Sequence, residues 1–249
     1  MIDREGKVGL TADEIVSTLS HSFLPTVIVE GDDDVIFFRQ LEEVQSEYGL
    51  SVLAVGGRET ALQVFNRRNE IQGTQKIAFI VDRDTWVIVG IPQSYENDDL
   101  LFTTGYSIEN DLFVDGELLR LMAGDERIKF EAELIKVVEW FALALSRILA
   151  GANERIGRHP NELLDNEERR LEMLRLNPGE PYPDELREII YADYANLLRG
   201  KTLIGLLMRQ LSYAGRQSRH NQLSMLEMVA HKKGPRLLAL FEKVRALFI

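Results

Sequence analysis

Short apolar runs rich in β-branched residues alternate with helical patterns in the first third of the chain. Residues 26–30 form the first run, and apolar positions at helical spacing follow over residues 33–48. The same pair recurs as a run at 51–55 with a helical pattern at 58–69, and a third run covers residues 76–81. Continuous apolar strands that alternate with helices predict a parallel sheet covered on both faces.

After the third run the pattern becomes irregular, which indicates a hairpin or insertion before a fourth strand near 101–104. A helix is expected from about Glu109, and from Phe130 onward the apolar positions recur at helical spacing. The fold class is therefore α/β, with a mostly α-helical subdomain after it. We expect the α/β domain to occupy residues 1–125, and the helical subdomain, with a basic C-terminal segment, to occupy residues 126–249.

Composition narrows the class of protein. The chain has 249 residues, 45% of them apolar, which is enough to bury a core. It has no cysteine, and this excludes disulfides, thiolate zinc sites and thiol nucleophiles. The N-terminus lacks the apolar region of a signal peptide, and no run is long enough to cross a bilayer. We expect a cytoplasmic protein without a membrane partner.

The chain has a formal net charge of -11, and its charged residues are distributed unevenly along the sequence. Residues 1–120 contain 9 Lys and Arg against 22 Asp and Glu, whereas residues 199–249 contain 10 against 2. A basic terminal segment could hold a phosphate backbone beside an acidic, metal-loaded centre. It could equally neutralise the acidic end of the chain or meet a protein, and composition alone does not separate these interpretations.

Acidic residues stand where two of the predicted strands end. Glu30 ends the first strand, and Asp82 and Asp84 follow the third. The carboxyl ends of parallel strands share one edge, and in a 2-1-3 strand order these acids would converge. Oxygen ligands of this kind suit Mg²⁺ or Mn²⁺, ions that polarise phosphoryl oxygens. The turn at 82–84 could also be a solvated loop, and Asp34 could be a helix-capping acid.

Several other residues could support such a site. Gly57, which follows Gly56, could let backbone N–H groups approach a phosphate or could simply form a tight turn. Arg83 could neutralise a scissile phosphate or pair with nearby acids. Glu109 stands at the start of a predicted helix after Ser107, where an acid favours the helix dipole.

Residues 195–202 satisfy the loose pattern of a phosphate-binding loop, but such a loop must follow a strand and be glycine-rich. This segment instead predicts a helix that ends in a glycine C-cap at Gly200. We therefore reject an ATPase role. The neighbouring Lys201 is kept as a cation that could contact phosphate at the site of the first domain.

Two motifs carry a family resemblance. The string VIVEGDDDVIFF, with Glu30, Gly31 and Asp34, and the string FIVDRD, with Asp82 and Asp84, resemble the two motifs of TOPRIM domains. Together with AVGGRE and YSIENDLF, they make residues 24–123 similar to a TOPRIM-like family of unknown function that is often encoded beside an ABC-type or AAA-type ATPase. The same region resembles the nuclease component of the PARIS antiphage defence system and OLD-type nucleases.

The resemblance implies a Rossmann-like sheet and metal-dependent cleavage of DNA or RNA with Mg²⁺ or Mn²⁺ as cofactor. It implies that Glu30 is the general base or acid, that Asp82 and Asp84 bind metal, and that Asp34 assists and is itself a candidate ligand. It also raises Glu109 as a residue lining the site. An ATPase partner and a role in antiviral defence follow from the same resemblance.

Two departures from the family pattern limit what is implied. Trp86 stands where the topoisomerase-type motif has its third acid, and the glycine-rich turn of primases is missing. We therefore expect neither a primase nor a topoisomerase. The main alternative is a non-catalytic TOPRIM-derived adaptor that docks on an ATPase partner. A phosphohydrolase of small molecules and a homo-oligomeric state also stay open.

Overall fold

The computed structural model describes residues 10–44, 49–73 and 75–248. Contacts between residues group the chain into two compact units, each of which is described by itself. The first unit combines residues 1–104 with the C-terminal residues 227–249, and the second contains the residues between them. This grouping differs from the predicted division after residue 125 in two ways: residues 105–125 group with the helical unit, and residues 227–249 group with the sheet.

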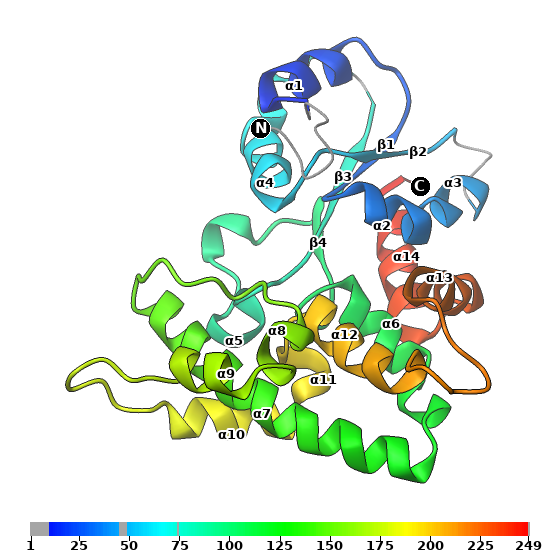
Figure 1. Ribbon diagram of the computed structural model, residues 1–249. Helices are drawn as coiled ribbons and strands as arrows, with labels where there is room; N and C mark the ends of the chain where they lie inside the picture. The colour runs from blue at the N-terminus through cyan, green and yellow to red at the C-terminus, as the bar shows by residue number, and fades with distance from the viewer. Residues whose placement is uncertain (1–9, 45–48, 74, 249) are drawn as a thin grey trace. The chain divides into compact units, whose positions relative to one another are not determined.

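The first unit is built on a four-stranded sheet with the strand order β2-β1-β3-β4 (Figure 1). The strands are β1 (Thr26–Val29), β2 (Ser51–Ala54), β3 (Ile77–Val81) and β4 (Leu100–Phe102). All three pairs of neighbours are parallel. The structure therefore confirms the predicted parallel sheet and the position of its fourth strand. Its first three strands have the 2-1-3 order, which is the condition for the acids after β1 and β3 to lie close together.

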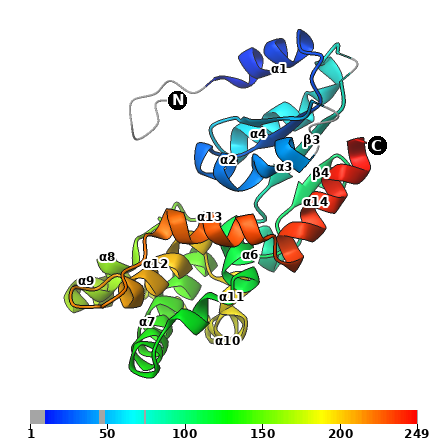
Figure 2. The ribbon, with the colours of Figure 1, turned by 90° about the vertical axis from the view of Figure 1, so that its right-hand side faces the viewer.

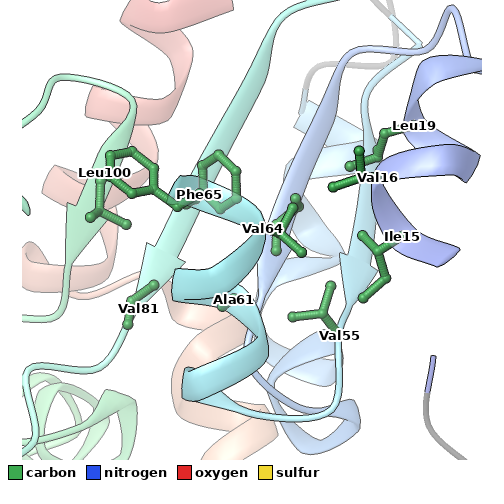
Figure 3. Packing of buried hydrophobic residues seen from close by; sticks show 11 residues of the cluster. Ile15, Val16, Leu19, Val55, Ala61, Val64, Phe65, Val81 and Leu100 are labelled. Carbon is green, nitrogen blue, oxygen red and sulfur yellow. The ribbon is translucent and has the colours of Figure 1, made fainter. Parts of the chain in front are cut away.

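Helices α1 (Ala12–Ser20) and α4 (Arg58–Asn66) cover one face of this sheet. Their apolar side chains pack on strand residues that share that face because strand side chains alternate between faces (Figure 3). The rings of Phe65 and Phe79 meet edge to face, with their centroids 5.3 Å apart. The buried members of this cluster are Ile15, Val16, Leu19, Ile28, Val55, Ala61, Val64, Phe65, Phe79, Val81 and Leu100.

The other face of the sheet is covered by α2 (Asp32–Phe38) and α14 (Pro235–Phe248). The rings of Phe38 and Phe241 lie 6.4 Å apart between centroids, and α14 packs against β4 (Figure 2). A helix from the far end of the sequence therefore completes the core of the sheet unit. The sequence pattern marked this segment as helical but did not assign it to the sheet.

The predicted helices of the first unit are present but shorter. The helix expected over residues 33–48 is broken at Arg39 into α2 and α3 (Gln40–Val44), and residues 45–48 lie outside the described part of the chain. The helix expected over residues 58–69 ends at Asn66, where α4 gives way to a 3-10 turn.

All residues between β3 and β4 are described, and they form no hairpin. The chain forms the short helix α5 (Trp86–Val89) and then a 3-10 turn at Gln93–Tyr95. Aromatic packing explains this: the Trp86 ring lies 5.0 Å from that of Tyr95 and 5.9 Å from that of Phe102. The apolar residues after Asp84 thus serve a local aromatic cluster instead of a strand.

The second unit is helical, as predicted. Its longest helix, α7 (Gly124–Leu149, 26 residues), packs against α10 (Asp184–Ala192) and α12 (Gly200–Leu211). Within the described residues, no helix combines the length and apolar character needed to cross a bilayer. The remaining helices are α6 (Ile108–Asp115), α8 (Pro160–Leu164), α9 (Glu167–Met173) and α11 (Tyr194–Leu197), with a 3-10 turn at Leu118–Leu121. Helix α13 (Gln222–Lys232) is divided, since its residues up to 226 group with the second unit and the later ones with the first.

The prediction of a helix that ends in a C-cap at Gly200 is wrong. Helix α11 ends at Leu197, and Gly200 is the first residue of α12. The chain passes so close to the start of α6 that a Cβ atom on Gly200 would lie 2.1 Å from Ser107 Oγ and 2.7 Å from Asn110 Oδ1. Close approach, and not helix termination, is therefore the reason for glycine at this position.

We predict that Gly200→Ala destabilises the protein by about 1–3 kcal/mol because the added methyl group overpacks a buried polar contact. In an open helical position the same change would stabilise by up to about 1 kcal/mol. Gly124, at the first position of α7, is the matched control because nothing lies within 4 Å of its added Cβ. Urea denaturation measures both; equal effects would contradict the close-approach explanation.

Candidate functional site

The first unit brings Glu30 and Asp82 together at the carboxyl edge of the sheet. Glu30 follows β1 and Asp82 follows β3, and these strands are direct neighbours. The backbone N–H of Asp82 donates a hydrogen bond of 2.8 Å to Glu30 Oε1. The side chain of Glu30 therefore joins the ends of the two strands.

The carboxyl group of Glu30 has a strongly altered acidity. Burial raises its pKa from 4.5 to about 8, and the hydrogen bond from Asp82 opposes part of this effect. The negative charges of Asp84 and Asp34 raise the pKa further, whereas the positive charge of Arg58 lowers it. Three carboxyl groups and one guanidinium thus act on one another electrostatically, and together with burial they leave the pKa of Glu30 far above its usual value.

Asp34 has a defined structural role. It lies in the first turn of α2, where its Oδ2 accepts a hydrogen bond of 2.8 Å from the N–H of Gly31. Its own N–H donates to the carbonyl oxygen of Gly31 at 3.0 Å. These contacts cap the helix, which is one of the two interpretations open from sequence. A role for Asp34 in metal binding stays a prediction.

The turn that carries Asp82 and Asp84 is held by Arg58, the first residue of α4. Arg58 Nε donates to the carbonyl oxygen of Asp82 at 3.1 Å, and Nη2 donates to that of Arg83 at 3.4 Å. The same Nε lies 3.5 Å from Asp84 Oδ2, and the guanidinium stacks 3.9 Å above the ring of Trp86. Asp84 itself adopts a left-handed conformation, with φ of 48°.

Arg58 and Trp86 were not among the residues that sequence patterns selected. Arg58 could have been noticed as a cation directly after the glycine turn at the end of β2. Trp86 drew attention only as a departure from the family pattern. In the structure, the two side chains form one stacked pair beside the acidic turn.

Gly57 and Arg83 contribute through their backbones. The N–H of Gly57 donates to the carbonyl oxygen of Glu30 at 2.6 Å, and its φ of 132° is a conformation that favours glycine. The N–H of Arg83 donates to Thr103 Oγ1 at 3.2 Å. These bonds connect the ends of β2 and β4 to the same edge. A direct contact of either residue with phosphate stays a prediction.

Glu109 and Lys201 belong to the second unit. Glu109 is buried in the first turn of α6 and accepts a hydrogen bond of 2.6 Å from Ser107 Oγ. Lys201 lies in the first turn of α12. Their proposed participation in a site formed by the sheet unit stays a prediction.

The carboxyl groups at the sheet edge have the right chemistry for Mg²⁺ or Mn²⁺ because both ions prefer oxygen ligands. In the described part of the chain, however, no three acidic or histidine side chains are arranged as a group that could hold a metal ion. Asp34 is bound to the N–H of Gly31 and Asp84 is near Arg58. Each of the three carboxyl groups thus has one oxygen engaged: Glu30 Oε1 by the N–H of Asp82, Asp34 Oδ2 by the N–H of Gly31, and Asp84 Oδ2 by Arg58.

Comparison with known proteins does not assign the chain to a family: it matches no protein-family model, and no curated protein is significantly similar to it. The chain is therefore classified by its fold and its candidate site alone. The chain is an α/β protein with a four-stranded parallel sheet, with Glu30 and Asp82 joined at its carboxyl edge, and with a helical second unit.

The pKa of Glu30 predicts how stability depends on pH in the absence of divalent cations. The unfolded chain releases this proton near pH 4.5 and the folded protein near pH 8, so the free energy of unfolding falls as pH rises through this window. Gln cannot ionise but can still accept the N–H of Asp82. We predict that Glu30→Gln is more stable than the wild type by about 4 kcal/mol at about pH 8, and that the difference disappears below about pH 4.5.

Chemical denaturation in a chelating buffer across this pH range checks the prediction. Glu59→Gln is the matched control because Glu59 is exposed on α4 of the same unit. If Glu30→Gln and Glu59→Gln show the same pH dependence as the wild type, Glu30 does not carry the raised pKa.

Proposed function

We propose that this protein is a TOPRIM-like, Mg²⁺- or Mn²⁺-dependent nuclease that hydrolyses phosphodiester bonds of DNA or RNA. The observation that carries the proposal is that neighbouring strands bring Glu30 against Asp82, where burial and the charges of Asp84 and Asp34 raise the pKa of Glu30. Clustered carboxyl groups with such a perturbed acidity are typical of functional sites. The motifs around Glu30, Asp82 and Asp84 resemble those of TOPRIM domains and support the same conclusion.

In the proposed reaction, the residues of the sheet edge have separate tasks. A bound divalent cation supplies charge that polarises the scissile phosphate and lowers the pKa of water. Asp82 and Asp84 would hold the ion, with Asp34 assisting. Glu30, which would lose its own proton when the cation binds, would accept a proton from the attacking water or, once protonated in this way, donate it to the leaving oxygen.

Exposed positive side chains in the same unit, which stand on the same helices as the exposed acids Glu227 and Glu242, support a polyanionic substrate. The end of α13 and the length of α14 carry Lys232, Lys243 and Arg245, all of them exposed. Residues 227–249 group with the sheet and not with the second unit. Positive side chains are therefore part of the unit that contains the acidic edge, which favours a substrate with several phosphates.

The biological setting is proposed on the resemblance alone. The similarity to the PARIS nuclease component and to OLD-type nucleases suggests the effector of an antiviral defence system that acts in the cytoplasm. An ABC-type or AAA-type ATPase would then be the partner that restrains or activates cleavage. The acidic net charge fits this idea because an isolated nuclease with a charge of -11 would bind nucleic acid poorly.

One observation favours a second function, that of a non-catalytic adaptor derived from a TOPRIM domain. Asp34 serves as a helix cap and Asp84 lies beside Arg58, so both carboxylates already have structural partners. An adaptor of this kind would dock on the ATPase and would not require a divalent cation. Metal titration separates the two functions.

We predict that the wild type cleaves at least one of plasmid DNA, single-stranded DNA and total tRNA in the presence of Mg²⁺ or Mn²⁺. The assay is run both with and without the proposed ATPase partner. Glu30→Gln and Asp82→Ala should each lower the rate by about 10²-fold or more because they remove the proton-transfer group and a metal ligand. Cleavage assays over a range of cation concentrations measure these rates.

The controls are Glu59→Gln and Asp98→Ala, which remove the same charges at exposed positions of the sheet unit. They should cleave at the wild-type rate. Full activity of both Glu30→Gln and Asp82→Ala would contradict the nuclease proposal. The absence of both cleavage and metal binding in the wild type would favour the adaptor.

We further predict that Lys232→Glu and Lys243→Glu raise the KM for a nucleic-acid substrate and reduce its dependence on salt concentration. Each lost phosphate contact should reduce by about one the steepness with which the logarithm of the binding constant falls with the logarithm of the salt concentration. Lys136→Glu, at an exposed position of α7 in the second unit, is the matched control. If the Lys232 and Lys243 variants leave KM unchanged, this surface does not bind the substrate.

A further inference from the structure

Arg58 makes more contacts with the acidic turn than simple charge balance requires. Its guanidinium donates to two successive backbone carbonyls, those of Asp82 and Arg83. It also lies 3.5 Å from Asp84 Oδ2 and stacks on Trp86. Contacts to main chain, side chain and ring fix the guanidinium in one place, with only 21% of the Arg58 side chain exposed.

The turn needs such support because its conformation is unusual. Asp84 has φ of 48°, a region that residues other than glycine occupy rarely and at some energetic cost. On the β4 side, the N–H of Arg83 is bound by Thr103 Oγ1. On the α4 side, the carbonyls that precede Asp84 are bound by Arg58. The N–H of Trp86 also donates to the carbonyl oxygen of Arg83 at 2.9 Å, so Arg58 supports a turn that backbone hydrogen bonds hold as well.

We propose that Arg58 is the positioning residue of the carboxylate site, which fixes the turn at residues 82–84 so that its two carboxylates face a divalent cation. The inference rests on the proposed function because that function supplies the role of the cation. Arg58 itself touches neither the cation nor the substrate in this role. It acts through the backbone of the turn and through Asp84.

The geometry requires the shape of arginine as well as its charge. Two nitrogens of one planar group reach two successive carbonyl oxygens, and the flat face of the same group covers the indole of Trp86. A lysine ammonium is a point charge that cannot reproduce this fork or the stacking. Arg58→Lys therefore keeps the positive charge while removing the fixed geometry.

The competing explanation is that Arg58 only neutralises the acidic cluster. The two explanations predict opposite results for metal binding. If Arg58 is merely a counter-charge, its removal makes the cluster more negative and strengthens cation binding, and Arg58→Lys behaves as the wild type. If Arg58 positions the turn, both Arg58→Ala and Arg58→Lys weaken binding.

The experiment measures the affinity of the full-length protein for Mn²⁺ by isothermal titration calorimetry. We expect Arg58→Ala and Arg58→Lys to bind Mn²⁺ about 10-fold or more weakly than the wild type, as is usual when a residue that orients metal ligands is lost. Arg68→Ala is the matched control. Arg68 also stacks on a ring, that of Phe65, and donates to a backbone carbonyl, and it follows α4 at the opposite end. Its loss should leave the Mn²⁺ affinity unchanged.

A second measurement distinguishes failure of this inference from failure of the proposed function. Hydrogen exchange of the peptide that covers residues 82–86 should accelerate in Arg58→Ala and Arg58→Lys but not in Arg68→Ala, whether or not metal binds. A wild type that binds no Mn²⁺ would reject the proposed function alone, with exchange still testing the positioning role. Unchanged exchange, or wild-type Mn²⁺ affinity in Arg58→Lys, would overturn the positioning role.

Discussion

The burial of one carboxyl group determines how the edge of the sheet is organised. Glu30 lies at the junction of β1 and β3, where removal from water raises its pKa to about 8. A buried carboxylate without compensation is unfavourable, so its surroundings must supply hydrogen bonds, a proton or positive charge. The N–H of Asp82 supplies the first, and the positive charge of Arg58 supplies part of the last. At neutral pH, the rest of the compensation for the buried carboxyl group of Glu30 comes from a proton or from a bound cation.

The same constraint links the fold to the proposed chemistry. A parallel sheet with neighbouring β1 and β3 brings the end of each strand to one edge. The glycine turn after β2 then places α4 so that its first residue, Arg58, reaches the turn after β3. Helix α14 completes the core from the far end of the chain. The carboxylate edge is thus a product of the whole first unit and not of a local motif.

Sequence patterns predicted the parts of this structure that repeat along the chain. Apolar runs located the four strands, and acids at two strand ends indicated Glu30 and Asp82 as neighbours. Patterns failed where a single tertiary contact decides the outcome. Position 200 requires glycine because the chain lies close to Ser107 there, and residues 86–89 form a helix in which Trp86 packs on Tyr95 and Phe102. Arg58 was missed for the same reason, since its partners are backbone carbonyls 24 and 25 residues away.

The most direct test of the account is the number of protons released when Mn²⁺ binds at neutral pH. Calorimetric titrations in buffers with different enthalpies of ionisation give this number. If the carboxylate edge binds the cation, Glu30 loses its proton on binding, and release of about one proton is expected. Binding without proton release would contradict the account because it would place the ion away from Glu30. Absence of binding would contradict it equally.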